Sequence, residues 1–323
     1  MPNTADARHL LIPFAGRLTP ECRAAIAGLQ LPNLTALLTR MAPVDTDTAG
    51  AGSLSPPHER ALARALGLAA PDGRLPWAAR EAALADLTTL ADGDGWARVT
   101  LCHWDVAIDE VVLGDPAALE IEPDHSRDLL EAARPFFEED GIMLHASGEP
   151  GHWLARCAVF EGLATASLDR AIGQPISAWS AGVRDERALR RLQNEMQMLL
   201  YTQRANDERG ALGQLPVNSF WISGTGVLPE DADLDSALPT VDDSLRQPAL
   251  QDDGAAWAAA WRALDAGPLA ALRTELERGQ PVTLTLCGDR AAQRWQPQPK
   301  GGLFAWIKRL FNRPRPAALL EAL

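Results

Sequence analysis

Cysteine is scarce in this chain of 323 residues, and its few copies lie far apart in the sequence, as Cys22, Cys102, Cys157 and Cys287. No Cys-x-x-Cys pair occurs, which excludes the common zinc knuckles and dithiol redox motifs. We therefore expect buried free thiols. The six histidines form no cluster with the spacing of metal ligands.

Long apolar runs are also missing. No stretch of 18 apolar residues indicates a membrane-spanning helix. The apolar run at residues 10–15 is short, is broken by Pro13, and lacks the basic region and small-residue cleavage site of a secretory leader. The expected compartment is the cytoplasm.

Positive charge is limited: 30 Lys and Arg stand against 43 Asp and Glu, for a formal net charge of -13. Nucleic-acid binding requires a basic face that neutralises phosphates, so the sequence predicts no nucleic-acid partner. Residues 300–315 differ, because they are basic and contain no acid; their charged residues are Lys300, Lys308, Arg309, Arg313 and Arg315. An acidic body thus carries a basic tail.

The hydrophobic content of 46% is sufficient for a sizeable core. Apolar spacing predicts a buried strand at residues 8–15, helices from residue 20 and at residues 31–41, a loop at 42–57, and helices at 58–66 and 77–90. Later segments predict helices at 255–264 and 269–277 and a strand at 282–287. We expect a single α/β domain over residues 1–299.

The middle of the chain has a different pattern. Short strands are predicted at residues 96–104, 111–113, 119–121, 142–145 and 153–159, around a helix that ends at Gly141. Residues 95–160 therefore indicate an α+β elaboration of the domain. Residues 226–253 hold eight Asp or Glu and a single Arg, and form an acidic connector.

A helix is predicted at residues 186–201, with polar residues beside its apolar face. A loop joins it to a strand at 217–223, which has large side chains on both faces and is expected inside the sheet. Two interpretations of the polar residues remain open. They hydrogen-bond to one another and to loop backbone. Alternatively, they form a small-anion pocket in which glycine backbone approaches the ligand. The candidate binding residues are Asn206, Arg209, Asn218, Ser219, Gly224 and Gly226.

Residues 206–226 read N-x-x-R-x-x-x-G-x-x-P-V-N-S-x-W-x-x-G-x-G. This stretch resembles the archaeal-type cofactor-independent phosphoglycerate mutases of the alkaline phosphatase superfamily. LPNLTALL at 31–38 and VTLTLCGDR at 282–290 resemble two further segments of that superfamily. The chain also resembles bacterial proteins described as phosphoglycerate mutase-like or RpfE-type regulatory proteins, through SLSPPHERALARALGL, LCHWDV, NEMQMLLY and PVNSFWISGTG.

The resemblance implies a three-layer α/β fold with a mixed sheet of the alkaline phosphatase type. It also implies two divalent metals held by Asp and His, and a serine that carries the phosphoryl group. The first strand ends in IPFAG without an Asp, and the late strand keeps Asp289 without the adjacent His. The metal site is therefore degraded: no cofactor is expected, and Mn or Mg would be needed for activity.

The best nucleophile candidates are Ser53 and Ser55, which precede a helix, with His58 as a base. The competing interpretation is a loop with a helix-capping hydroxyl.

Three functions follow from these patterns. The first is a mutase-like protein that binds or regulates, with a small phosphorylated acid or a protein as partner. The second is an active metal-dependent mutase or phosphotransferase that uses Ser53 or Ser55 together with Asp289. The third is an adaptor that acts through the tail at residues 300–323. In that tail residues 302–313 form an amphipathic helix able to dock on the acidic body or on a partner, and only weakly on a membrane.

Overall fold

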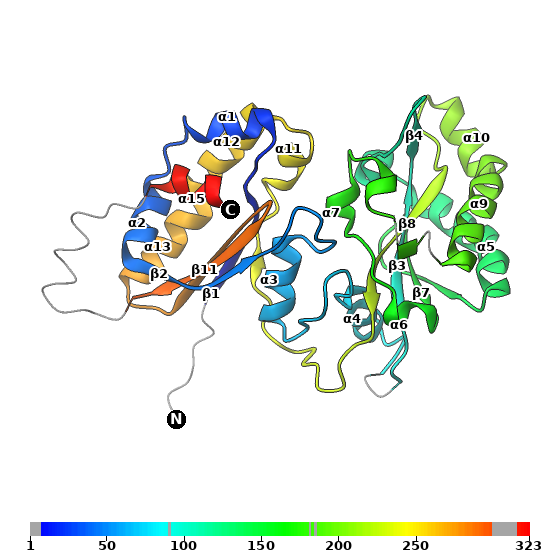
Figure 1. Cartoon of the computed structure of the whole chain (residues 1–323), viewed down its shortest axis with the longest axis horizontal. Helices are drawn as coiled ribbons and strands as arrows, with labels where there is room; N and C mark the ends of the chain where they lie inside the picture. The colour runs from blue at the N-terminus through cyan, green and yellow to red at the C-terminus, as the bar shows by residue number, and fades with distance from the viewer. Residues whose placement is uncertain (1–7, 90–91, 181, 184–185, 299–314) are drawn as a thin grey trace, which may run out of the picture. The chain divides into compact units, whose positions relative to one another are not determined.

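The computed structural model describes residues 8–89, 92–180, 182–183, 186–298 and 315–323. The chain forms two compact units (Figure 1). Unit 1 comprises Met1–Gly52, Pro56–Leu66 and Asp235–Leu323, and unit 2 comprises Ser53–Ser55 and Gly67–Leu234. This division differs from the single domain predicted over residues 1–299, because the middle of the chain builds a sheet and a core of its own.

Unit 1 contains a mixed five-stranded sheet in the order β2-β11-β10-β1-β9. Strand β1 lies between β10 and β9 and is parallel to both, whereas β11 is antiparallel to β10 and to β2. The predicted α/β class with a mixed sheet is confirmed. The strands are β1 (Arg8–Gly16), β2 (Met41–Thr48), β9 (Thr240–Val241), β10 (Val282–Gly288) and β11 (Ala291–Pro297).

Helices cover both faces of this sheet. Leu10 and Ile12 of β1 face the main core, which also contains Trp257 and Trp261 of α12. The alternate residue Leu11 faces a smaller cluster with α3, as expected from the two-residue period of a strand. The helices of unit 1 are α1 (Pro20–Ile26), α2 (Pro32–Arg40), α3 (Pro57–Ala65), α11 (Arg246–Leu250), α12 (Gly254–Leu264), η3 (Asp265–Leu269), α13 (Ala270–Glu277) and α15 (Pro316–Ala322).

Strand β2 corrects the loop predicted at residues 42–57. Its sequence MAPVDTDT is polar and contains Pro43, features that favour a loop. β2 lies at the edge of the sheet, where a proline is tolerated and one face meets solvent. Its partner β11 was not predicted either. The sequence pattern of both strands is weak, so their pairing depends on tertiary contacts.

Unit 2 contains a four-stranded antiparallel sheet in the order β6-β7-β3-β8, next to a two-stranded β4-β5 hairpin. Val99 and Phe220 face a core with α5 and α9, and α4 contacts β3 and β8. The strands are β3 (Trp96–Cys102), β4 (Trp104–Val106), β5 (Val111–Leu113), β6 (Met143–Ala146), β7 (His152–Arg156) and β8 (Ser219–Gly226). The helices are α4 (Trp77–Leu84), η1 (Pro116–Leu119), α5 (Pro123–Glu139), α6 (Val159–Gly162), α7 (Leu168–Ala171), η2 (Ile176–Ala178), α9 (Arg187–Tyr201) and α10 (Arg204–Ala211).

Several details of unit 2 differ from the sequence predictions. The strand predicted inside the main sheet is β8, which lies at the end of the unit 2 sheet. The strand predicted at 119–121 is replaced by η1, whose cap residue Glu120 adopts left-handed backbone. Helix α10 was not predicted. The α+β character predicted for residues 95–160 extends over Gly67–Leu234.

The acidic segment 226–253 contains β9 and α11 and belongs partly to each unit. Of the basic tail, residues 299–314 lie outside the described residues, and with them the helix predicted at 302–313. The following residues form α15, which packs on unit 1. None of the helices that the structure describes is long and apolar enough to cross a membrane.

The cysteines are free thiols, as predicted, and three of the four are buried. Burial raises the pKa of Cys22 to about 11, and it also raises the pKa values of Cys102 and Cys287. Such thiols stay protonated and are poor nucleophiles.

Candidate functional site

The carboxyl end of β1 is bulged in unit 1. Ile12 pairs with Leu286 and Gly16 pairs with Gly288, so three residues of β1 lie opposite one of β10. Within the bulge Phe14 has a φ of 54°, a left-handed conformation that is uncommon outside glycine. Strained backbone and bulges concentrate near functional sites, which makes this strand end a candidate.

Two tryptophans of α12 support the bulge. The indole N–H of Trp257 donates to the backbone oxygen of Phe14 at 3.1 Å, and that of Trp261 donates to the oxygen of Ala15 at 3.2 Å. Both side chains are fully buried. The spacing of four residues places them on one face of α12, and their hydrogen bonds replace the sheet pairing that the bulge removes.

Asp289, the predicted metal ligand, follows β10 and forms an ion pair with Arg17. The Arg17 Nη1 to Asp289 Oδ1 distance is 2.8 Å, and the backbone N–H of Leu18 donates to Oδ2 at 2.8 Å. Arg17 also donates to the backbone oxygen of Ala249. Both carboxylate oxygens of Asp289 thus accept hydrogen bonds from the segment that follows β1.

His58, the predicted base, lies in the same unit. Its ring centroid is 5.1 Å from that of Phe14, and the guanidinium of Arg17 lies 5.9 Å from the centre of the same ring. Phe14 therefore connects His58 with the Arg17–Asp289 pair. His58 and Asp289 are brought to one strand end, although the sequence motifs that contain them are far apart.

The residues at this site do not fit the two-metal centre that the resemblance implies. Within the part of the chain that the structure describes, no three His, Cys, Asp or Glu side chains gather closely enough to hold a metal ion. The guanidinium of Arg17 instead places a positive charge against the Asp289 carboxylate.

Helix α15 covers the same strand ends. Leu320 and Leu323 are fully buried and belong to the main core of unit 1. Their neighbours are Gly16 and Gly288: a Cβ at Gly288 would lie 2.6 Å from Leu323, and one at Gly16 would overlap the backbone oxygen of Leu320. The backbone N–H groups of Arg290 and Ala291 both donate to the oxygen of Leu323, at 2.7 and 2.6 Å.

Ser53 and Ser55 belong to unit 2, whereas His58 belongs to unit 1. The Ser53 hydroxyl donates to Asp72 at 2.8 Å, and the Ser55 hydroxyl accepts from the backbone N–H of Gly73 at 2.9 Å. Burial would raise the pKa of Asp72, but hydrogen bonds from Leu54 and from both serines hold it below its usual value. These contacts are those of a closed, hydrogen-bonded loop.

Asn206 and Arg209 of α10 bind backbone. The Asn206 amide donates to the oxygens of Leu200 and Val217 and accepts from the N–H of Val217. Arg209 is 1% exposed and donates to the oxygens of Leu215 and Leu119. Its Nη1 has no hydrogen-bond partner among the described residues. Burial lowers the pKa of Arg209. Both side chains tie loops to the helix.

The other predicted binding residues lie directly before β8 and along it. The Asn218 side chain accepts from the N–H of Trp104 at 2.7 Å and donates to its oxygen at 2.9 Å. Ser219 is fully buried, and its hydroxyl has no partner within the described part of the chain. Gly224 lies six positions after Asn218, about 20 Å away at the usual rise of a strand. One small-anion pocket cannot include both ends.

Gly224 and Gly226 make room for protein rather than for a ligand. Gly224 has a φ of 63°, and a Cβ there would lie 3.2 Å from the Cβ of Trp77. A Cβ at Gly226 would lie 2.9 Å from the backbone oxygen of Arg74. The two glycines allow the segment before α4 and the start of that helix to approach β8 closely.

The LPNL motif also has a structural partner. The buried carboxylate of Asp265 accepts from the backbone N–H groups of Asn33 and Leu34, at 3.1 and 2.8 Å. The Asn33 side chain donates to the backbone oxygen of Asp265 at 3.0 Å. Asp265 thus satisfies free N–H groups in the first turn of α2, where a negative charge is favoured.

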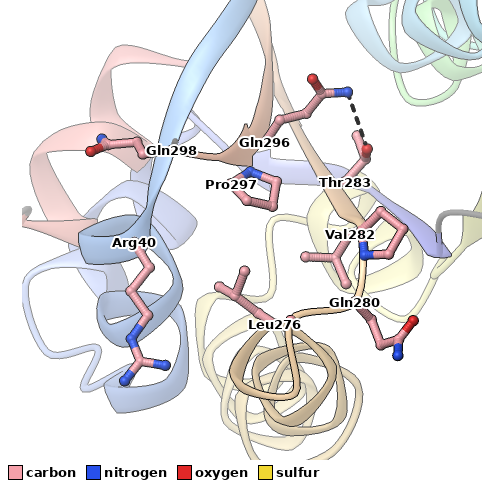
Figure 2. A pocket seen from close by; sticks show the side chains of 10 residues that line it. Arg40, Leu276, Gln280, Val282, Thr283, Gln296, Pro297 and Gln298 are labelled. Atoms are coloured by element: carbon pink, nitrogen blue, oxygen red, sulfur yellow. Dashed lines mark hydrogen bonds between the residues drawn. The ribbon is translucent and has the colours of Figure 1, made fainter. Parts of the chain in front are cut away.

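A surface groove of about 650 Å³ lies at the opposite end of the unit 1 sheet, around the start of β10 (Figure 2). Four of its polar side chains have partners: Gln296 donates to Thr283, Gln298 donates to the backbone oxygen of Met41, and Arg40 pairs with Glu277 at 3.2 Å. Leu276, Val282 and Pro297 form its apolar part. The groove contains none of the predicted site residues.

Sequence analysis did not identify Arg17, Phe14 or α15 as parts of the site. Two signals were present: a glycine and an arginine directly after a buried strand, and two tryptophans four residues apart. Neither signal indicates which residue is contacted in the fold, because the contacts join residues more than 200 positions apart.

No protein-family model matches the sequence, and no curated protein is similar to it. Among solved structures, the cofactor-independent phosphoglycerate mutase from Thermoplasma acidophilum DSM 1728 is similar over 97% of this chain and 98% of that chain, with a TM-score of 0.33 and 14% identity. The PH0037 protein from Pyrococcus horikoshii is similar over 90% of this chain and 87% of that chain, with a TM-score of 0.44 and 13% identity. At these values the similarity is a weak one of fold, and it assigns no activity.

Proposed function

We propose that this chain is a phosphoglycerate mutase-like protein that binds a partner and does not transfer phosphoryl groups. The observation that carries the proposal is the Arg17–Asp289 ion pair, with both carboxylate oxygens of Asp289 engaged by Arg17 and by the backbone N–H of Leu18. A metal ligand must offer a free oxygen lone pair, and a guanidinium at 2.8 Å competes directly with a cation for it.

The position of the pair supports a binding role. Ligands of open α/β sheets bind beyond the carboxyl ends of parallel strands. β1 and β10 are parallel neighbours, and Arg17, Asp289 and the strained Phe14 all lie at their carboxyl ends. We therefore place the binding site at this end of unit 1.

The contacts of Asn206 and Arg209 favour a protein partner over a small phosphorylated acid. Arg209 is buried, and its guanidinium donates to two backbone oxygens, which leaves it no exposed donor for a phosphate. Asn206 makes three hydrogen bonds to backbone. The remaining guanidinium nitrogen of Arg209, Nη1, is buried, and Asn206 could bind an anion only by leaving its backbone partners unsatisfied.

Metal content and turnover test the proposal. The purified full chain is expected to contain far less than one equivalent of metal, and to interconvert 2-phosphoglycerate and 3-phosphoglycerate no faster than a blank after addition of manganese. Near-stoichiometric metal with turnover, abolished by Asp289→Asn and by Ser53→Ala or Ser55→Ala, would establish the active mutase instead. The paired control is Glu277→Gln, which removes an acid from an exposed ion pair elsewhere in unit 1.

A further inference from the structure

The strand ends of β1 and β10 form a seat for a helix. Gly16 and Gly288 present bare backbone there, and any side chain at either position would meet α15. The N–H groups of Arg290 and Ala291 point at one acceptor, the backbone oxygen of Leu323. Two glycines and two convergent donors thus shape the surface for a chain segment.

The segment that fills this seat is amphipathic. Leu320 and Leu323 are buried, and Ala317 and Leu319 are partly buried against the same core. Ala318 and Glu321 are exposed. Apolar residues at positions i, i+3 and i+6 place one face of a short helix on the sheet, with Ala318 and Glu321 on the outward face.

The helix is short, and its order depends on docking. Isolated helices of fewer than about 12 residues are marginal in water, so Pro316–Ala322 is expected to lose its helical structure when it leaves the seat. In unit 1 it contacts β1 and α1 among other elements. Residues 299–314 join it to β11 in the sequence, so its docking on unit 1 is an intramolecular event.

From these contacts we infer that the carboxyl ends of β1 and β10 form a peptide-binding site, which residues 315–323 of this chain occupy as an exchangeable internal ligand. The ligand class is a short helix with a Leu-x-x-Leu face whose last backbone oxygen accepts from Arg290 and Ala291. The inference rests on the proposed binding function and names the chemistry of its partner. Release of the helix uncovers Gly16 and Gly288, next to the Arg17–Asp289 pair.

Hydrogen exchange of the unmodified full chain tests whether the helix leaves its seat. Amides of residues 319–323 are expected to exchange at least a hundredfold faster than those of β1 and β10, because release needs no unfolding of the sheet. Equal protection of the helix and these strands would overturn the inference, since α15 would then open only with the whole of unit 1.

Peptide binding to a full-length variant tests the seat itself. Leu320→Asp puts a charge in the apolar contact and is expected to release the internal helix. A fluorescent peptide of residues 315–323 should then bind this variant at least tenfold more tightly than it binds the unmodified chain. Ala318→Asp is the matched control: it adds the same charge on the exposed face of the same helix, and should leave peptide binding as weak as in the unmodified chain.

A second substitution locates the binding. Gly288→Val in the Leu320→Asp background is expected to abolish peptide binding, because the new side chain occupies the place of Leu323. The inference fails when the folded Leu320→Asp variant does not bind the peptide, and also when circular dichroism shows that this variant does not fold, since α15 is then inseparable from the core. Metal-dependent turnover would overturn the proposed function without changing these peptide results.

Discussion

Arg209 in unit 2 and Arg17 in unit 1 each follow a segment with a clear apolar pattern, but they donate hydrogen bonds to different kinds of acceptor. Arg209 donates to two neutral backbone oxygens and is 1% exposed. Arg17 pairs with the carboxylate of Asp289 at 2.8 Å, and both side chains keep some exposure to solvent. The first arginine holds loops together, whereas the second neutralises an acid at a strand end.

The glycines of the two units show the same contrast. Gly224 and Gly226 accommodate Trp77 and the backbone of Arg74, which belong to the fold of unit 2. Gly16 and Gly288 accommodate α15, a short helix whose connection to β11 runs through residues 299–314. In unit 2 the glycines allow parts of the fold to pack closely. In unit 1 they form the seat of a segment that we infer to be exchangeable.

The largest expected effect tests the structural role of Arg209. Arg209→Ala should lower the free energy of unfolding of unit 2 by about 3 kcal/mol, because it leaves the buried oxygens of Leu119 and Leu215 without donors. Urea denaturation combined with hydrogen exchange of α10 amides measures the change. Arg204→Ala on the same helix removes exposed ion pairs and should leave stability nearly unchanged. If Arg209→Ala were as stable as the unmodified chain, the structural role would be wrong and a role of Arg209 in a small-anion pocket would be favoured.

Gly224→Ala sharpens the comparison of glycines. We expect a loss of about 2 kcal/mol in the free energy of unfolding, since a Cβ there is strained by a φ of 63° and lies 3.2 Å from Trp77. Gly213→Ala provides the control, because its φ is 71° and a Cβ would meet nothing within 4 Å. It should cost about 1 kcal/mol from backbone strain alone. Equal losses in the two variants would show that the contact of β8 with α4 is unimportant.

Asp289→Asn addresses the charge pair of unit 1. The substitution should lower the free energy of unfolding by about 1.5 kcal/mol, because it weakens a charge-assisted hydrogen bond that is mostly shielded from solvent. Thermal denaturation without a chelator measures this loss of stability, and denaturation with a chelator tests whether Asp289 binds a metal. The melting temperature of the unmodified chain should not respond to the chelator. A large shift on chelation, absent in Asp289→Asn, would instead make Asp289 a metal ligand.

The last prediction concerns the pH dependence of stability due to His9. Burial, with a contribution from Arg294, lowers the pKa of His9 from 6.5 to about 4. Between these values the unfolded chain binds a proton that the folded chain excludes, so stability falls as the pH decreases through this range. Urea midpoints at pH 7 and pH 5 should differ less in His9→Gln than in the unmodified chain. His145 and His152, whose pKa values are also lowered by burial, keep part of the slope in both. An identical slope in both proteins would show that His9 titrates normally.

Much of the fold was predictable from residue spacing. The strand at residues 8–15, the helix at 186–201 and the strand at 282–287 correspond to β1, α9 and β10, because each buries a continuous apolar face or run that sequence displays directly. β2 and β11 were not predicted as a pair, since their polar residues match an edge of a sheet as well as a loop. The division into two units was also not visible, because segments from both ends of the chain build unit 1.

The sequence by itself determined the strongly apolar strands and helices such as β1, α9 and β10, the acidic charge of the body, and that Asp289 follows β10 without an adjacent histidine. Tertiary structure alone decided the partner of each polar group and glycine. It placed Arg17 on Asp289, Phe14 beside His58, and α15 on Gly16 and Gly288. The reason is physical: local spacing fixes backbone conformation and apolar faces, whereas a hydrogen bond, an ion pair or a close backbone contact depends on distances between segments that only folding brings together.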